Sequence, residues 1–300
     1  MSYPVKNTVR KAVFPVAGLG SRFLPATKAS PKEMLPVVDR PLIQYAVEEA
    51  IASGITELIF ITGRNKRAIE DHFDKAYEME AELEMRGRTQ MLDVVKNILP
   101  KGVSCIFIRQ TEALGLGHAV LCAKPVACDG PFAVILADDL IDGEPPAMKQ
   151  MVEQFGRHGC SMVGVENVAR SETGQYGIVD AQELESGLLL NINGIVEKPQ
   201  PETAPSTLAV VGRYILTPRI FDCLENVAPG KGGEIQLTDG IASLLESEKV
   251  LAYRFIGKRY DCGSKLGYMK ANVEFALRHP EIGAEFRDYL EGAAKNLMGK

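Results

Sequence analysis

The 300-residue sequence lacks the apolar segments that would place a chain in or across a membrane. None of its apolar runs approaches the roughly 20 residues needed to cross a bilayer. The first ten residues, MSYPVKNTVR, also lack the apolar core of a signal peptide. The six cysteines form no Cys-x-x-Cys pair, so free thiols are expected rather than structural zinc or disulfides. We therefore expect a cytoplasmic protein with no membrane partner.

An excess of positive charge is missing as well. With 34 Lys and Arg against 39 Asp and Glu, the net charge is −5, which argues against a general nucleic-acid binder. An acidic chain can still bind anions where its cations are concentrated locally. The length suits one large α/β domain or two small ones, and no internal repeat, low-complexity segment or linker divides the chain. We therefore predict a single domain over residues 1–300.

The common nucleotide-binding motifs are absent too. A dinucleotide-binding turn needs a third glycine three residues after Gly20, and that position is Phe23. Such a fold also needs an acid near the end of its second strand, where residues 61–64 read ITGR. No Gly-Lys-Ser/Thr P-loop occurs, and the four histidines are too scattered for a metal cluster or a serine triad. These absences disfavour a nicotinamide dehydrogenase and a P-loop nucleotide site.

A glycine turn followed by clustered cations stands where those motifs would be. Residues 17–36 read AGLGSRFLPATKASPKEMLP and come directly after a short apolar run. Gly18 and Gly20 permit backbone conformations and close approaches that a Cβ would block. Successive exposed N–H groups, together with cations such as Arg22 and Lys32, can form a cradle for a polyphosphate.

Short β-rich apolar runs alternate with amphipathic stretches through the first half of the chain. This alternation predicts a parallel sheet with helices on both faces. After residue 170, segments punctuated by glycine predict a small antiparallel extension, and helical patterns return near the C-terminus. The predicted fold class is therefore α/β, with a Rossmann-like, mostly parallel sheet. The predicted strands are 12–16, 58–62, 104–108, 132–137, 161–165, 176–180, 188–197, 207–216 and 250–255, and the predicted helices include one from Pro41 to Gly54, a helical region over 66–97, and 218–225, 236–246, 264–278 and 284–297.

Three aspartates fall where ligands bind in open α/β sheets, beyond the carboxyl ends of strands or in later loops. Asp138 and Asp139 follow the predicted strand 132–137 and should face the same opening as the glycine loop. Near a polyphosphate they would attract Mg²⁺, which prefers a few carboxylates together with phosphate oxygens and water. Asp261, in the string RYDCGS, is suited equally well to capping the helix that follows it.

Two further segments carry groups suited to a base or a sugar phosphate. Gln110 follows the predicted strand 104–108, and its amide can accept from a pyrimidine N3–H while donating to a carbonyl. Gly115 nearby leaves space for a flat base. In the string NGIVEKP, the proline biases Lys198 toward an extended backbone, so Glu197 and Lys198 should point to opposite sides. By itself this pair is typical of an exposed pair before a turn.

The pattern Gly-x-Gly-x-Arg, followed by Lys32 and Pro36, resembles the nucleotidyltransferase loop of the sugar-nucleotide pyrophosphorylases. The string from Phe14 to Pro36 is similar in particular to the bacterial UTP–glucose-1-phosphate uridylyltransferases, and matching segments follow in order to about Tyr268. The resemblance implies that UTP and α-D-glucose 1-phosphate react to give UDP-glucose and pyrophosphate, by in-line, Mg²⁺-assisted attack on the α-phosphorus. It implies a nucleotide-binding half over about 11–170, a sugar-binding half over about 171–263 and a C-terminal helical tail over about 264–300.

The resemblance also implies roles for single residues. Arg22 and Lys32 would be catalytic, stabilising the triphosphate and the leaving pyrophosphate. Asp138 and Asp261 would hold Mg²⁺, and Lys198 would neutralise the sugar phosphate. The implied nucleotide-binding residues are Ala17, Gly18, Gly20, Arg22, Lys32, Gln110, Gly115 and Asp138, and the implied sugar-phosphate-binding residues are Gly177, Glu197 (for hexose hydroxyls), Lys198, Val211 and Gly212.

Several alternatives stay open at the level of sequence. A thymidylyltransferase of the same fold would differ by the room around pyrimidine C5, and a regulatory relative would bind an active enzyme without catalysis. Lys28 is a candidate helper at the phosphates, and Asp139 is a weaker metal candidate than Asp138. His118 is expected on the helix after the base-binding turn, because direct transfer between phosphates needs no imidazole. The resemblance suggests a homodimer or homotetramer.

Overall fold

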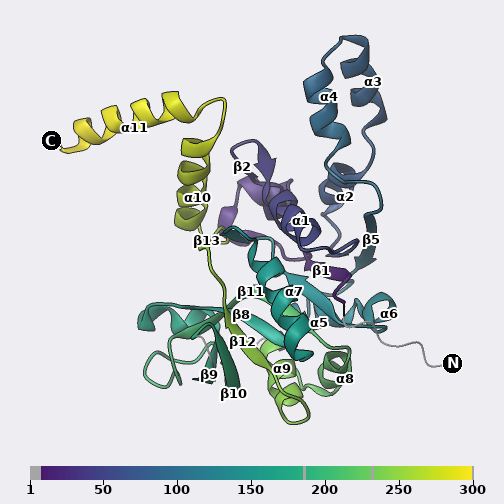
Figure 1. Cartoon of the computed structure of the whole chain (residues 1–300), viewed down its shortest axis with the longest axis vertical. Coiled ribbons are helices and arrows are strands. Elements are labelled where there is room, and N and C mark those ends of the chain that lie inside the picture. Colours follow the sequence, from purple (N-terminus) through teal and green to yellow (C-terminus); the bar gives the residue numbers. More distant parts are fainter. Residues whose placement is uncertain (1–7, 185–186, 231–232, 299–300) are drawn as a thin grey trace.

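A nine-stranded sheet runs through the whole molecule (Figure 1). The structure is a computed structural model, and it describes residues 8–184, 187–230 and 233–298. The strands lie in the order β5-β4-β1-β6-β11-β8-β12-β10-β9. Because strands far apart in sequence, such as β6 and β11, lie side by side in this order, residues from distant parts of the chain meet at the ends of the strands.

The first half of the sheet is parallel, as predicted. β1 pairs with β4 on one side and with β6 on the other, and β4 pairs with β5, all in the parallel sense. Parallel strands that are covered on both faces consist of nearly continuous apolar residues, which is the pattern of β1, β4 and β6, whereas β5 lies at the edge of the sheet and is only half-buried. These strands are β1 (Lys11–Pro15), β4 (Glu57–Thr62), β5 (Ser104–Arg109) and β6 (Phe132–Ile135).

The second half corrects the predicted topology, because the sheet is mixed rather than mostly parallel with a small extension. β11 lies between β6 and β8 and is antiparallel to both. β10 is antiparallel to β12 and β9, and only β12 and β8 pair in parallel. One further pairing, between β11 and β9, closes the five strands of this half into a ring. They are β8 (Met162–Asn167), β9 (Gly177–Glu183), β10 (Leu189–Glu197), β11 (Leu208–Leu216) and β12 (Leu251–Arg254).

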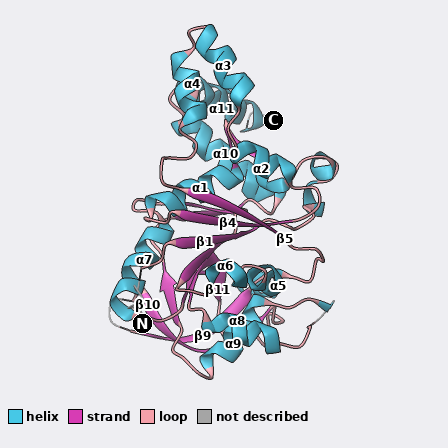
Figure 2. Cartoon of the chain, turned by 90° about the vertical axis from the view of Figure 1, so that its right-hand side faces the viewer, coloured by secondary structure: helices cyan, strands magenta, loops and turns pink. Residues whose placement is uncertain are grey.

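Each face of the sheet has its own apolar core, because successive residues of a strand point to opposite faces. On one face, Val13 and Ile59 pack with residues of α5, α6, α8 and α9. On the other face, Phe14 and Phe60 pack with residues of α1, α2 and α7. Figure 2 shows helices on both sides of the strands. The bounds are α1 (Leu42–Ala52), α2 (Arg67–Phe73), α5 (Leu116–Leu121), α6 (Lys124–Ala127), α7 (Ala147–His158), α8 (Arg219–Asn226) and α9 (Leu237–Leu245).

The remaining helices project from this body (Figures 1 and 2). α3 and α4 form a hairpin, and α10 and α11 follow the last strand, in agreement with the predicted helical regions. Within the described part of the chain, none of the helices has both the length and the apolar character to span a bilayer. The bounds are α3 (Tyr77–Met85), α4 (Thr89–Lys96), α10 (Lys265–Arg278) and α11 (Gly283–Met298).

Two short strands that the sequence did not predict bring two of the candidate aspartate segments together. β7 and β13 form an antiparallel pair in which Asp261 lies opposite Asp139. The neighbouring loop is built from 3-10 turns, with Lys32 opening one of them. These elements are β7 (Asp139–Asp142), β13 (Lys258–Asp261), the small pair β2 (Pro36–Val37) and β3 (Arg40–Pro41), and the 3-10 turns η1 (Ser21–Phe23), η2 (Ala26–Lys28), η3 (Lys32–Met34) and η4 (Arg170–Gln175).

Candidate functional site

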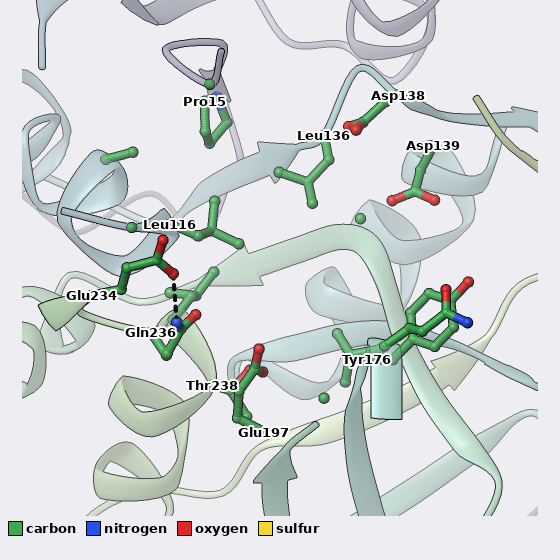
Figure 3. Close-up of a pocket in the computed structure, with 18 of the residues that line it drawn as sticks. Pro15, Leu116, Leu136, Asp138, Asp139, Tyr176, Glu197, Glu234, Gln236 and Thr238 are labelled. Carbon is green, nitrogen blue, oxygen red and sulfur yellow. Dashed lines mark hydrogen bonds between the residues drawn. The ribbon is translucent and has the colours of Figure 1, made fainter. Parts of the chain in front are cut away.

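A cavity of about 580 Å³ lies beyond the carboxyl ends of β1, β5 and β6, where the two halves of the sheet meet (Figure 3). Its lining comes from the glycine loop, the turn before α5, strands β9 to β11, the start of α9 and the end of β13. It therefore collects residues from nearly the whole length of the chain. The predicted residues that line it are Ala17, Gly18, Arg22, Lys32, Gln110, Gly115, Asp138, Asp139, Gly177, Glu197, Lys198, Gly212 and Asp261.

Two predicted site residues lie outside this lining. Gly20 has φ +67°, and a Cβ there would lie 3.1 Å from the Cβ of Lys32, so this glycine shapes the loop. Its carbonyl accepts a hydrogen bond from Thr27 Oγ1 at 2.7 Å, which closes the turn. The Val211 side chain is 1% exposed and packs in an apolar cluster behind the cavity, while its neighbour Val210 contributes to the lining.

Lys32 and Asp138 form an ion pair at the phosphate-loop side of the cavity. Lys32 Nζ lies 2.5 Å from Asp138 Oδ2. Burial would lower the pKa of Lys32, but the attraction of Asp138 and Glu33 outweighs it, so the pKa is raised. Burial would likewise raise the pKa of Asp138, but Lys32 outweighs it and the pKa is lowered. Both shifts favour the charged forms, so the site presents a lysine cation and a carboxylate side by side.

Asp261 approaches Asp138 from the far end of the sequence. A Cβ placed on Gly263 would lie 3.0 Å from Asp138 Oδ2 and 3.0 Å from Asp261 Oδ1. The two carboxylate oxygens are therefore at most 3.0 + 3.0 = 6.0 Å apart. Arg22 Nη1 lies 3.3 Å from the same point. Two carboxylates and an arginine thus converge on one small volume.

The capping interpretation of Asp261 fails. The N-cap of α10 is Ser264, whose hydroxyl accepts a hydrogen bond from the N–H of Gly267 at 3.0 Å. Asp261 Oδ1 accepts from the N–H of Gly263, which precedes the helix. In the described ranges there is no group of three or more His, Cys, Asp or Glu side chains arranged around a common point. A pair of carboxylates with room for phosphate oxygens and water is the kind of protein contribution that Mg²⁺ accepts.

Asp139 is held differently from its neighbour. Its Oδ1 accepts from Arg259 Nε at 2.5 Å, and Arg259 Nη1 also donates to Glu166 at 2.6 Å. The Arg259 guanidinium lies over the ring of Tyr176, 5.2 Å from its centroid. A Cβ on Gly212 would overlap the Asp139 carboxylate, so glycine is required there. Asp139 is therefore tied into a buried arginine network, whereas Asp138 faces the phosphate loop.

The opposite side of the cavity carries Glu197, Lys198 and Thr238. Thr238 and Glu197 lie side by side (Figure 3), and Thr238 Oγ1 donates to Glu197 Oε2 at 2.7 Å. Lys198 Nζ lies 2.9 Å from Glu197 Oε1. The prediction that Glu197 and Lys198 point to opposite sides is wrong. Lys198 adopts φ +45° instead of an extended backbone, which turns its side chain toward its neighbour. Gly177 lies against this pair, with a built Cβ 2.9 Å from Thr238 Oγ1.

Gln110 lies at the third corner of the cavity, next to the turn before α5. Its Nε2 is 3.1 Å from the carbonyl oxygen of Gly115 and 3.0 Å from Nδ1 of His118, which lies on α5 as predicted. Gly115 lines the cavity, and the fit of the protein around it also requires glycine. A Cβ there would lie 2.8 Å from the carbonyl oxygen of Ile235.

Comparison with known proteins places this arrangement in a family. A family model described as nucleotidyl transferase matches residues 11–277. The UTP–glucose-1-phosphate uridylyltransferase of Escherichia coli K12 is 51% identical over 294 residues, covering 96% of this chain and 97% of that protein. This chain belongs to the nucleotidyl transferase family.

Solved structures agree with this assignment. A UTP-bound UDP-glucose pyrophosphorylase from Acinetobacter baumannii superposes with a TM-score of 0.87 at 46% identity, over 94% of this chain and 99% of that one. A UDP-glucose pyrophosphorylase complexed with UDP-glucose superposes with a TM-score of 0.83 at 45% identity, over 91% of this chain and all of that one. The nucleotidyl transferase fold predicted from the sequence is confirmed, with the mixed sheet described above.

The structure adds residues of this nucleotidyl transferase that sequence reasoning missed. Arg213 is fully buried and donates to both carboxylate oxygens of Glu49, at 3.0 and 2.6 Å. It also donates to the carbonyl oxygens of Leu136 and Asp139, which flank the segment carrying Asp138. The sequence offered one indication of this role: Arg213 is the single charged residue within the apolar run LAVVGRYIL. An arginine buried in such a strand requires hydrogen-bonding partners. Arg259 gave no comparable signal.

Proposed function

We propose that this chain transfers a uridylyl group from UTP to α-D-glucose 1-phosphate, giving UDP-glucose and pyrophosphate. Its uridylyltransferase relative and the structures bound to UTP and to UDP-glucose support this activity. The main support is the geometry of the cavity. Lys32, Arg22, Asp138 and Asp261 converge on one side of it, the phosphate wall. Glu197, with Lys198 and Thr238, lies on the opposite side, the sugar wall. One wall suits a triphosphate and the other suits a sugar phosphate.

The phosphate wall would act through position and charge. The sugar phosphate is already a nucleophile, so its oxygen can attack the α-phosphorus in line while pyrophosphate leaves. Arg22 and Lys32 would neutralise charge on the triphosphate and on the leaving group. Lys28, on the same loop, ends η2 and stays a candidate helper. The close pairing of Lys32 with Asp138 supports this because the cation is already oriented toward the reacting wall.

Asp138 and Asp261 are the residues that would hold Mg²⁺. Asp138 Oδ2 and Asp261 Oδ1 each lie 3.0 Å from a Cβ built on Gly263, and both residues line the cavity. When bound, the cation would neutralise developing charge on phosphate oxygens. Asp139 is the weaker candidate, because Arg259 already occupies its carboxylate.

Glu197 and Lys198 would recognise the sugar phosphate. Thr238 fixes one oxygen of Glu197, so the carboxylate is presented in a defined orientation to hexose hydroxyls. Lys198, with 51% of its side chain exposed, is free to turn toward a 1-phosphate. Gly177 and Gly212 leave room beside these groups, since side chains there would collide with Thr238 and Asp139. We assign these contacts to a sugar-binding half over about 171–263, with nucleotide contacts in about 11–170 and a helical tail over about 264–300.

We also propose that the chain assembles as a homodimer or homotetramer in the cytoplasm. Large apolar side chains are exposed on the two projecting elements, including Tyr77 at 72% and Met85 at 78% on α3, and Tyr289 at 68% and Leu297 at 77% on α11. Large apolar side chains exposed on projecting helices are available to a protein interface. Light scattering of the purified protein tests this, and a monomer across the accessible concentration range would contradict it.

The activity is tested by pyrophosphate release with glucose 1-phosphate and UTP, dTTP, ATP or GTP in turn. We expect release with UTP and little with the purine nucleotides. Preference for dTTP would identify a thymidylyltransferase. No release with any nucleotide from a folded sample would indicate the non-catalytic alternative.

A further inference from the structure

The amide of Gln110 can adopt only one orientation in this structure. Its terminal nitrogen faces two groups, the carbonyl oxygen of Gly115 at 3.1 Å and Nδ1 of His118 at 3.0 Å. A backbone carbonyl only accepts hydrogen bonds, so the group facing it must be the NH₂. His118 Nδ1 must then be the unprotonated ring nitrogen, with the imidazole proton on Nε2. Both N–H bonds of the amide are thereby used.

This orientation leaves the amide oxygen of Gln110 free to accept a hydrogen bond. Gln110 is 9% exposed and lines the cavity. Among the residues that the structure describes, none donates a hydrogen bond to its Oε1, and Oε1 is not among their buried atoms that lack partners. The site therefore presents a hydrogen-bond acceptor, and not a donor, at its base-side corner.

We propose that His118 is a positioning residue that, together with the Gly115 carbonyl, holds the Gln110 oxygen toward the nucleobase and thereby selects uracil over cytosine. This inference rests on the proposed uridylyl transfer. Uracil has an N3–H that donates to such an oxygen, whereas cytosine has a lone pair at N3 and would repel it. To accept cytosine, the amide must rotate, which breaks both of its bonds and turns its oxygen toward two acceptors.

The backbone that carries the two acceptors is tied to the segment before α9. The N–H of Gly117 donates to the carbonyl of Ile235 at 2.8 Å, and the N–H of Ile235 donates to the carbonyl of Leu114 at 2.7 Å. A Cβ on Gly117 would lie 2.7 Å from the Ile235 oxygen, so the turn and this segment are in direct contact. Because these contacts fix the turn and the start of α5, the Gly115 carbonyl and the backbone of His118 keep their positions relative to the amide.

The test replaces His118 in two ways and measures kcat/KM for UTP and for CTP with glucose 1-phosphate. His118→Leu removes the acceptor, whereas His118→Asn keeps one, since the Asn Oδ1 occupies a place similar to that of Nδ1. We expect His118→Leu to lower kcat/KM for UTP about five- to tenfold and to narrow the UTP-to-CTP ratio by a similar factor. His118→Asn should keep the ratio near that of the unchanged protein. The KM for glucose 1-phosphate should stay the same in both variants.

An unchanged UTP-to-CTP ratio in His118→Leu would overturn the proposal, as would equal behaviour of the Leu and Asn variants. Equal losses for both nucleotides would show a merely structural role. If His118→Leu does not fold, His118→Ala removes the acceptor with a smaller side chain and is measured in its place. If the unchanged protein shows no uridylyl transfer, the proposed function fails. Calorimetric titration of UTP and CTP into the same variants then still decides whether His118 sets base selectivity.

Discussion

The two walls of the cavity both carry a lysine beside a carboxylate, but they are built in different ways. On the phosphate wall, Lys32 and Asp138 are 106 residues apart in sequence and meet at 2.5 Å, with 24% and 26% of their side chains exposed. On the sugar wall, Glu197 and Lys198 are neighbours in sequence, and the lysine side chain is 51% exposed. The first pair exists only in the folded chain, whereas the second depends on one residue with a left-handed backbone.

The Lys32–Asp138 pair is therefore held in place by the fold, whereas the exposed Lys198 can change its conformation. Groups that the fold holds beside one another need not reorganise when charge develops in a reaction, so they should contribute mainly to the rate. An exposed lysine contributes little to the stability of the folded protein and is free to follow a ligand. We therefore expect variants of the phosphate wall to change kcat, and variants of the sugar wall to change the KM for the sugar phosphate.

The largest effect should come from the carboxylates of the phosphate wall. Asp138→Asn and Asp261→Asn keep the side-chain shape but remove a charge, and each should lower kcat by about 10²–10³. Steady-state assays over a range of Mg²⁺ concentrations measure this. Asp142→Asn, on the same β7–β13 pair but bonded to Arg278, is the matched control and should keep its turnover. Ordinary turnover and Mg²⁺ dependence in either test variant would remove that aspartate from the proposed set.

Lys32→Ala should have the next largest effect. Removal of a positioned cation from the phosphate wall should lower kcat and kcat/KM together, by about a hundredfold. Substrate-saturation curves for both substrates separate the two parameters. A change confined to the KM for glucose 1-phosphate would instead place Lys32 at the sugar phosphate. It would contradict the expectation that the phosphate wall acts mainly on kcat.

Lys198→Ala should raise the KM for glucose 1-phosphate by about tenfold while leaving UTP binding intact. Loss of a charge-assisted hydrogen bond costs on the order of 1.5–3 kcal/mol, and the exposure of Lys198 favours the lower end. The double variant with Glu197→Gln should still bind UTP. Calorimetric titration of UTP measures this, and loss of UTP binding in a folded double variant would refute the division between the walls.

The smallest effect should follow Thr238→Val. This change keeps the shape of the side chain but removes the hydroxyl that donates to Glu197 at 2.7 Å. The KM for glucose 1-phosphate should rise about two- to fivefold, because one neutral-to-charged hydrogen bond that orients the carboxylate is lost. Thr238→Ser retains the hydroxyl and is the control. If both variants behave like the unchanged protein, Glu197 does not need Thr238 to hold it.

The parallel half of the molecule was predictable because its determinants are local. The runs at β1, β4 and β6 are mostly apolar and buried, which is the requirement for strands covered on both faces, and the edge strand β5 keeps an apolar centre between polar ends. The later segments were also recognised as strands, but their order was not. β11 enters between β6 and β8, and this placement depends on burying all nine of its residues against partners from both halves.

By itself, the sequence identified candidates for the cavity: residue types and position pointed to the glycine loop with its cations and to Asp138, whereas Asp261 was singled out only by the family resemblance. Only the tertiary structure decided which of these groups touch. The pairing of β7 with β13 brings the two aspartate segments together, and a left-handed backbone turns Lys198 toward Glu197. The buried pair of Arg213 and Glu49 likewise exists only across the fold. Local patterns specify elements, whereas contacts between residues far apart in sequence follow from how the elements bury one another's surfaces.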